Sequence, residues 1–252
     1  MDLGLTGKKA IVTGSTKGIG RAIAEALLDE GASVAICARD ADGVQKAVAD
    51  LSQRGTVWGS AVDAAVSDSL RGFVAGAIEA LGGLDIYVHN TSGKPNKTFE
   101  GWQSNMDIDL MALVHGVDAA AAAMEAGGAG CLISISTSAV GEHFASGANS
   151  YSAFKAAVTN WTLGQAQVLG ARGIRCNVVS PGPIWVEGGD WSRVKEGRPE
   201  FFEATEKAHP MGSIGDVQDV ATAVVFLASP AAKHINGANL TVDGGFLKRV
   251  DF

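Results

Sequence analysis

Short apolar segments with the character of buried strands alternate with amphipathic segments of helical periodicity along the whole chain of 252 residues. The strand-like segments are Lys9–Gly14, Ser33–Ala38, Thr56–Val62, Leu84–His89, Cys131–Ser136, Ile174–Val179 and Ala238–Val242. This alternation is typical of a parallel sheet that helices cover on both faces. We therefore predict an α/β fold, a doubly wound parallel sheet of about seven strands, formed by one domain over residues 1–252.

The expected helices in the second half of the chain are Trp102–Met124, Asn149–Leu169 and Pro210–Ala228. Between the last two lies a long polar stretch, Pro181–His209, which carries several aromatic side chains and breaks the alternation. Long irregular segments inside compact domains are usually functional. We predict that residues at about 184–209 form a lid over a substrate site.

Composition and charge narrow the class of partner. The 20 Lys and Arg residues are outnumbered by 27 Asp and Glu, and the net charge of −7 argues against a nucleic-acid partner. No apolar run approaches the roughly 18 residues of a membrane span, and the N-terminal residues lack a signal-peptide core. Cys37, Cys131 and Cys176 sit in strand-like segments without metal-ligand spacing. We expect buried thiols, no metal site, a cytoplasmic location and a small-molecule substrate.

A glycine-rich loop joins the first strand-like segment to the helix that follows it. Its glycines allow a tight turn and let a diphosphate approach the free N–H groups of the helix N-terminus, where the helix dipole favours an anion. A three-glycine pattern by itself also fits a plain strand–helix turn, but its place after the first strand favours a dinucleotide site. The residues predicted to line it are Gly14, Ser15, Thr16, Lys17, Gly18, Ile19 and Gly20.

The residues that follow the second and third strands indicate which dinucleotide binds. An NAD site usually offers a carboxylate to the ribose 2′-hydroxyl, whereas a 2′-phosphate needs positive charge. Arg39 directly follows the second strand, and Lys17 adds a cation from the glycine loop. Both are also consistent with solvated surface charges, and Asp40 lies beside Arg39. We expect NADP(H) rather than NAD(H), with Asp63 either on the adenine amino group or capping a helix.

A tyrosine and a lysine four residues apart, Tyr151 and Lys155, share one face of a predicted helix. Ser138 lies 13 residues before Tyr151 in the loop after the fifth strand. An ammonium about 5 Å from a phenol would lower the phenol pKa from about 10 by roughly two units. We therefore predict that Tyr151 acts as acid and base and that Ser138 orients a substrate oxygen.

These motifs together resemble those of the short-chain dehydrogenase/reductase family, from about Leu5 to Gly245. Further matches are Asp63, Asn90-Thr91-Ser92-Gly93, Asn177, Pro181-Gly182 and Asp243-Gly244-Gly245. The resemblance implies a Rossmann fold, a homotetramer and reversible ketone–alcohol oxidoreduction with a nicotinamide cofactor. It implies that Tyr151 is the acid/base, that Lys155 also binds the nicotinamide ribose, and that the cofactor contacts Asn90, Gly93, Pro181, Gly182 and Ile184.

The chain departs from the family pattern at the fourth catalytic position. The family has an asparagine seven residues after a tryptophan, and counting from Trp102 gives Asp109, with Asn105 one turn earlier. We expect Asp109 to accept a hydrogen bond from the water that links the lysine to solvent. Its charge should stabilise protonated Lys155 and oppose ionisation of Tyr151.

Two smaller departures concern packing and cofactor contacts. The first asparagine of the family motif is His89 here, which we interpret as a packing residue at a strand end. The family threonine after Pro-Gly, which often contacts the nicotinamide amide, is Val186.

The expected substrate is a hydrophobic cyclic or aromatic carbonyl compound. The predicted contacts are Ser92, His143, Phe144, Trp185 and Trp191, with Lys94, Trp102, Ala139, Val140, Phe201 and Phe202 as further candidates. The lid mixes both signs of charge and does not indicate a phosphorylated or carrier-bound substrate. A 3-oxoacyl-thioester reductase is the alternative substrate class, and a non-catalytic dinucleotide-binding regulatory protein is the alternative of another kind.

Overall fold

Seven parallel strands form the central sheet, in the order β3-β2-β1-β4-β5-β6-β9. The structure, a computed structural model, describes residues 2–142 and 147–249. The predicted α/β fold with a parallel sheet is confirmed. The strands are β1 (Lys9–Val12), β2 (Ser33–Ala38), β3 (Val57–Ala61), β4 (Ile86–His89), β5 (Gly130–Ile135), β6 (Ile174–Pro181) and β9 (Asn239–Val242).

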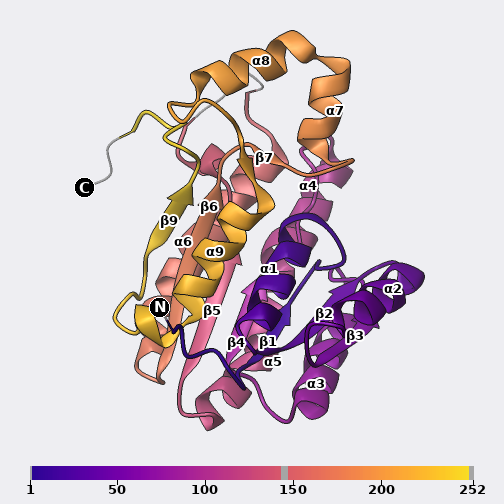
Figure 1. Cartoon of the computed structure of the whole chain (residues 1–252), viewed down its shortest axis with the longest axis vertical. Coiled ribbons are helices and arrows are strands. Elements are labelled where there is room, and N and C mark those ends of the chain that lie inside the picture. The colour runs from indigo at the N-terminus through magenta and orange to yellow at the C-terminus, as the bar shows by residue number, and fades with distance from the viewer. Residues whose placement is uncertain (1, 143–146, 250–252) are drawn as a thin grey trace.

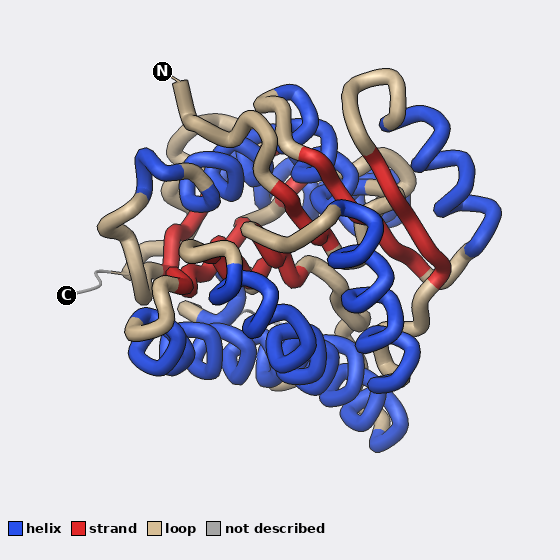
Figure 2. The backbone as a smooth tube through the Cα atoms, turned by 90° about the horizontal axis from the view of Figure 1, so that it is seen from below, coloured by secondary structure: helices blue, strands red, loops and turns tan. Residues whose placement is uncertain are grey.

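Helices cover both faces of this sheet (Figure 2). One apolar core lies between the sheet and α1 (Gly18–Asp29), α2 (Ala41–Leu51) and α9 (Val217–Ala228). The other lies between the sheet and α3 (Ser67–Leu81), α5 (Ala112–Ala126) and α6 (Ser150–Gly170). Because each face is covered, the central strands are buried on both sides and read as continuous apolar runs.

The helix predicted over Trp102–Met124 is longer and is interrupted. It begins as α4 (Phe99–Asn105), passes through a π-helical turn (Met106–Met111) and continues as α5. Thr98 caps its start by accepting a hydrogen bond from the N–H of Gly101. π-Helical turns inside α-helices occur often at functional sites, and this one contains buried Asp109.

The predicted lid segment holds regular structure. The two-residue strand β7 (Ile184–Trp185) pairs with β8 (Gly215–Asp216), and α7 (Asp190–Gly197) and α8 (Pro199–Ala208) lie between them in the chain. Figure 1 shows α7 and α8 in orange at the end of the molecule to which the strand arrows point. The helix predicted from Pro210 begins only at Val217, where Asp216 and Asp219 form a capping box.

The three cysteines are buried and form no disulfide, as predicted. Burial raises the pKa of Cys37 and of Cys176 to about 12 and that of Cys131 to about 11. Among residues 2–142 and 147–249, no helix has the length and apolar character to cross a membrane.

Candidate active site

The loops that carry the predicted site residues follow β1, β4, β5 and β6 at the carboxyl edge of the sheet. The chain proceeds from β1 toward β3 on one side and from β4 toward β9 on the other, so the strand order reverses between β1 and β4. Ligands of open parallel sheets bind in the crevice at such a reversal. The Asn90 amide spans it by donating to the carbonyls of Thr13, at 3.0 Å, and Gly14, at 2.9 Å.

The glycine loop has the backbone shape that a diphosphate site needs. Gly14 and Gly18 have φ values of 62° and 58°, a region that residues with a Cβ rarely adopt. A Cβ on Gly20 would collide with the Asn90 amide and the Gly14 carbonyl. Lys17 begins α1 without a side-chain cap. The first N–H groups of this helix therefore suit an anion, and these residues fit the diphosphate of a dinucleotide.

The residues predicted to select the cofactor lie at the surface. Arg39 and Lys17 are exposed, and neither forms an ion pair with a residue that the structure describes. Asp63 is exposed, and its carboxylate accepts a hydrogen bond from the N–H of Ala65 at 3.1 Å. The next helix, α3, has Val66 as its N-cap, so Asp63 does not cap it, and the contact of Asp63 with adenine stays a prediction.

The lysine predicted to be catalytic lies in a buried ion pair. Asn149 caps the start of α6, which places Tyr151 in the first turn and Lys155 one turn later. The Lys155 Nζ lies 3.3 Å from Asp109 Oδ1 and donates to the carbonyl of Ile135 at 2.9 Å. Both charged side chains are almost inaccessible to solvent, at 2% for Lys155 and 0% for Asp109. Burial lowers the pKa of Lys155, and Asp109 opposes that change.

Asp109 receives donors on both of its oxygens. Oδ1 accepts from the Ser92 hydroxyl at 2.8 Å, and Oδ2 accepts from the Asn105 amide at 2.7 Å and from the Gly93 N–H at 3.2 Å. With Lys155, the carboxylate has four donor groups. Asp109 thus contacts Lys155 directly, while its predicted contact with a water stays a prediction. Asn105 shares a face with Asp109 because the two are four residues apart, a signal that the sequence carried.

The pKa of Tyr151 differs in direction from the sequence-based expectation. Burial raises the pKa of Tyr151 to about 12, a hydrogen bond with the Thr137 side chain opposes this, and the carboxylates of Asp109 and Asp190 add to the increase. Lys155 is not among the groups that lower the pKa of Tyr151, in contrast to what the spacing of the two residues predicts. Tyr151 is therefore protonated at neutral pH.

Ser138 is available to a ligand. It is buried and begins a short 3-10 turn (Ser138–Val140) that packs against α6. Its hydroxyl makes no hydrogen bond with any residue in the described part of the chain. The neighbouring Thr137, which the sequence analysis did not single out, accepts a hydrogen bond from the N–H of Ala139, and its side chain lowers the pKa of Tyr151.

His89 supports the backbone beneath this site. Its Nε2 lies 3.0 Å from the carbonyl of Asp109, while its Nδ1 is buried without a partner among the described residues. Since a carbonyl only accepts, Nε2 carries the proton. Burial, together with the nearby Lys155 charge, lowers the pKa of His89 to about 3. His89 is therefore neutral at physiological pH, consistent with a packing role.

The segment after β6 crosses toward the glycine loop. The Gly182 N–H donates to Val242 at 2.9 Å, and a Cβ on Gly182 would collide with Asp243. Ile184 is buried, and Val186 reaches Gly18, because a Cβ on that glycine would lie 3.4 Å from Val186 Cγ1. Residues 182–186 therefore lie along the same crevice as the glycine loop, where the nicotinamide contacts are predicted.

The predicted substrate contacts are distributed over different environments. Ser92 is hydrogen-bonded to Asp109. Trp185 and Trp191 lie in an aromatic cluster with Phe201 and Phe202, in which Trp191 stacks on Phe201 with ring centroids 6.2 Å apart. His143 and Phe144 lie outside the described residues. Of the further candidates, Trp102 packs edge-on against Phe154, and Lys94, Ala139 and Val140 lie in the loops after β4 and β5.

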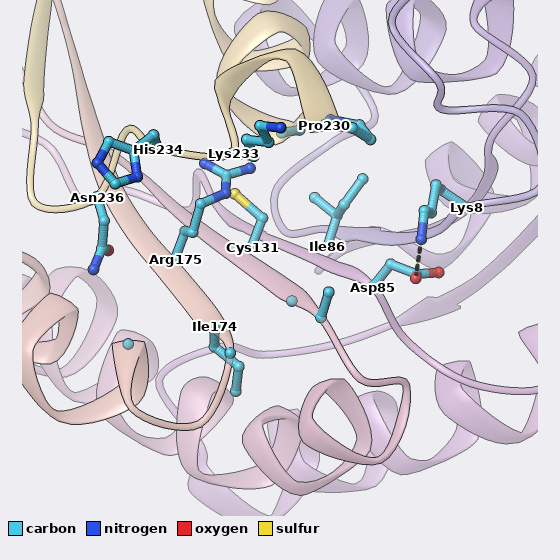
Figure 3. A pocket seen from close by; sticks show the side chains of 15 residues that line it. Lys8, Asp85, Ile86, Cys131, Ile174, Arg175, Pro230, Lys233, His234 and Asn236 are labelled. Carbon is cyan, nitrogen blue, oxygen red and sulfur yellow. Dashed lines mark hydrogen bonds and ion pairs between the residues drawn. The ribbon is translucent and has the colours of Figure 1, made fainter.

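A separate pocket opens at the opposite, amino edge of the sheet (Figure 3). Three of its charged side chains are engaged: Lys8 pairs with Asp85 at 2.9 Å, and Arg175 donates to the carbonyls of Leu227 and Ile235. Within the described ranges, no three His, Cys, Asp or Glu side chains are grouped so that they could hold a metal ion. The chemistry-bearing residues therefore gather at the carboxyl edge.

Comparisons with known proteins agree with this geometry. A family model described as "Enoyl-(Acyl carrier protein) reductase" matches residues 14–247. The chain is 34% identical over 248 residues to isoepoxydon dehydrogenase from Penicillium expansum, covering 96% of this chain and 95% of that protein. It is 31% identical over 255 residues to 7alpha-hydroxysteroid dehydrogenase from Escherichia coli, covering 99% and 98%.

Solved structures extend the likeness to proteins with bound cofactor. L-Sorbose reductase from Gluconobacter frateurii, complexed with NADPH and L-sorbose, superposes with a TM-score of 0.92 at 28% identity over 99% of this chain and 100% of that one. A 7alpha-hydroxysteroid dehydrogenase complexed with NADH gives 0.90 at 30% identity over 99% and 98%. With its glycine loop and its Ser138, Tyr151 and Lys155 at one edge of the sheet, this chain belongs to the short-chain dehydrogenase/reductase family, oxidoreductases that use a nicotinamide dinucleotide on alcohol and carbonyl substrates.

Proposed function

We propose that this protein is an NADP(H)-dependent enzyme that interconverts a ketone and a secondary alcohol, with a hydrophobic cyclic or aromatic carbonyl compound as substrate. The observation that carries the proposal is the fixed position of the Lys155 Nζ, between Asp109 and the Ile135 carbonyl, one helical turn from Tyr151. The unpaired hydroxyl of Ser138 lies in the adjacent turn.

Each of these side chains has a distinct part in the reaction. When bound, the reduced nicotinamide supplies a hydride to the carbonyl carbon. The Ser138 hydroxyl donates a hydrogen bond to the carbonyl oxygen and holds it in place. Tyr151, protonated at neutral pH, transfers its phenolic proton to that oxygen as it becomes an alcohol. The Lys155 ammonium binds the nicotinamide ribose, and Asp109 keeps that amine charged.

The preference for NADP(H) rests on two exposed cations. Lys17 is the N-cap residue of α1, and Arg39 directly follows β2. A guanidinium suits a 2′-phosphate because it forms paired charge-assisted hydrogen bonds. We expect Arg39→Ala to weaken NADPH binding about tenfold, the loss of one charged hydrogen-bonding group, and to leave NADH binding unchanged. Titration of cofactor fluorescence measures both constants.

Arg172→Ala is the control for this experiment, since Arg172 is a surface arginine paired with Glu125 at the opposite edge of the sheet. The 2′-phosphate assignment is wrong if NADH binds more tightly than NADPH and Arg39→Ala leaves NADPH binding intact.

The preference for a cyclic or aromatic substrate rests on the lid. Trp185 and Trp191 present apolar rings between α7 and α8, and Asp190 at the start of α7 is near enough to Tyr151 to raise its pKa. The lid helices therefore approach the acid/base. Relatives named isoepoxydon dehydrogenase and 7alpha-hydroxysteroid dehydrogenase support substrates with rings.

A 3-oxoacyl thioester is the second candidate substrate. The observation that favours it is a relative from Vibrio cholerae, 3-oxoacyl-[acyl-carrier-protein] reductase, which is 33% identical over 248 residues. Acetoacetyl-CoA in the same assay separates the two candidates. If acetoacetyl-CoA is reduced with a higher kcat/KM than any cyclic ketone, the substrate is a 3-oxoacyl thioester.

The experiment that tests the function follows NADPH absorbance at 340 nm against a panel of cyclic and aromatic ketones. We expect Tyr151→Phe to reduce kcat by about 10²- to 10⁴-fold, the usual contribution of a general acid. The chain has two tyrosines, so Tyr87→Phe is a matched control. The Tyr87 hydroxyl is buried without a partner among the described residues, and its removal should leave kcat unchanged.

Equal activity of Tyr151→Phe and the native protein would refute the proposed role of the tyrosine. A native protein that binds NADPH but reduces no ketone and no thioester would favour the non-catalytic alternative.

We also propose that the protein is a homotetramer in the cytoplasm. Phe99 on α4 and Val168 on α6 are exposed by 91% and 60%, and Leu240 lies on the edge strand β9. We expect these side chains to be covered by contacts between the copies. Light scattering should give four times the chain mass of 25.8 kDa, and a monomer at micromolar concentration would contradict this assembly.

A further inference from the structure

Asn105 is a buried polar residue that the proposed reaction does not use. It ends α4, immediately before the π-helical turn, and is 1% exposed. Its side chain lies between Ser150 at the start of α6 and Asp109 in the π-helical turn. The inference drawn from this position rests on the proposed function, because it concerns the same site.

The chemistry of its two neighbours fixes the orientation of the Asn105 amide. An ionised carboxylate only accepts hydrogen bonds, so the Asn105 Nδ2 must face Asp109, at 2.7 Å from Oδ2. The carbonyl Oδ1 then faces Ser150, whose hydroxyl donates to it at 2.7 Å. The Ser150 hydroxyl also accepts from the Asn96 N–H at 3.2 Å, and the Ser150 N–H donates to the Asn96 carbonyl at 3.0 Å. The amide is therefore bonded at both ends, and a rotated amide would leave Asp109 facing a carbonyl oxygen.

The surrounding backbone leaves Asn105 little freedom. A Cβ on Gly93 would collide with the Asn105 amide and would lie 3.2 Å from Asp109 Oδ2. Glycine at this position therefore lets the loop after β4 approach both side chains and donate its own N–H to Asp109. The charged or titratable groups around Asp109 are Lys155 and Tyr151 from α6 and His89 from β4.

We propose that Asn105 is a positioning residue, which holds the Asp109 carboxylate against the Lys155 ammonium so that the amine stays fixed beside Tyr151. The asparagine thus acts through the aspartate and does not touch the substrate. Without its amide, Asp109 would keep Ser92, Gly93 and Lys155 as donors but lose the contact that fixes Oδ2 from the helix side.

The first test is structural and needs no substrate. In crystals of the Asn105→Leu variant, the distance between Asp109 Oδ1 and Lys155 Nζ should lengthen beyond 4.0 Å, from 3.3 Å in the native chain. Leucine has a similar volume but forms no hydrogen bond. An unchanged ion pair in that variant would overturn the proposal.

The second test is a double-mutant cycle of ketone reduction with Asn105→Leu, Asp109→Asn and the double variant. In the native background, Asn105→Leu should lower kcat about tenfold, the loss of one hydrogen bond to a charged group, with KM unchanged. In the Asp109→Asn background, the same change should have an effect below about twofold. Equal effects in both backgrounds would show that Asn105 does not act through Asp109.

An exchanged variant covers the case in which leucine prevents folding. Asn105→Asp combined with Asp109→Asn keeps both side-chain shapes but moves the carboxylate one turn away from Lys155. Its kcat and pH profile should follow those of Asp109→Asn, and native behaviour would contradict the proposal. If the native protein reduces no substrate, the proposed function fails, while the crystal structure of Asn105→Leu still decides this inference.

Discussion

The two ends of the crevice are organised in opposite ways. At the glycine loop, Lys17 and Arg39 are exposed and α1 begins without a side-chain cap. At the other end, Asp109 and Lys155 are buried, and the carboxylate has four donors from the protein itself. The donors of the glycine loop, the nucleotide end of the crevice, therefore depend on a bound anion for a partner. At the other end, which carries Tyr151, the protein itself supplies the partners of both charged groups.

Breaking the buried pair should have the largest effect. Lys155→Met leaves the Asp109 carboxylate buried without its counter-ion, which should reduce the free energy of unfolding by about 3–5 kcal/mol. Lys8→Met is the control, because it breaks the half-exposed pair with Asp85 and should cost no more than about 1 kcal/mol. Urea denaturation measures both. If both variants lose a similar free energy of unfolding, the buried pair of Asp109 and Lys155 contributes no more to stability than the pair of Lys8 and Asp85.

The nucleotide end should be more sensitive to backbone shape than to stability. A Cβ on Gly20 would collide with the Asn90 amide and the Gly14 carbonyl, so Gly20→Ala should weaken NADPH binding by tenfold or more, about 1.4 kcal/mol. Gly72→Ala on α3 is the matched control, since no atom lies within 4 Å of its added Cβ. Calorimetric titration with NADPH compares the two variants, and equal affinities would remove the glycine loop from the binding site.

The smallest expected effect is a shift in pH dependence. Ketone reduction needs protonated Tyr151 and is lost as the pH rises through the tyrosine pKa, whereas alcohol oxidation needs the ionised form and increases over the same range. Asp109 raises the pKa of Tyr151, which burial brings to about 12. Asp109→Asn should therefore move both transitions to lower pH, by about one unit if the two charges interact by 1.4 kcal/mol.

The pH–rate profiles of both directions measure this shift. If Asp109→Asn changes neither the pH–rate profile nor the turnover, Asp109 takes no part in the acid/base chemistry. The two ends of the crevice would then differ in burial and hydrogen bonding but not in their effect on the reaction.

The fold was predictable because periodicity reports burial. Strands buried on both faces read as apolar runs, and the alternation with helices identified the parallel sheet. Tyr151 and Lys155 were found because residues four apart share a helix face. The predicted start of the last helix, at Pro210, is wrong, because α9 begins at Val217. The sequence carries the correct signal, since Asp216 and Asp219 have the spacing of a capping box.

The electrostatics of the site could not be predicted from spacing. The direction of the Tyr151 pKa depends on burial and on Asp190 from a distant part of the chain. The direct contact between Asp109 and Lys155 depends on the π-helical turn, which the sequence pattern did not indicate. Asn105 was visible at the right offset from Asp109, but its partner Ser150 is 45 residues away.

Transfer of deuterium from the C4 position of labelled NADPH tests most directly whether the preorganised end performs carbonyl reduction. The ketone of the panel with the highest kcat/KM should yield an alcohol that carries deuterium on its carbinol carbon, with Tyr87→Phe as productive as the native protein and Tyr151→Phe forming about 10²- to 10⁴-fold less. Unlabelled alcohol, or equal labelled product from Tyr151→Phe, would contradict the account.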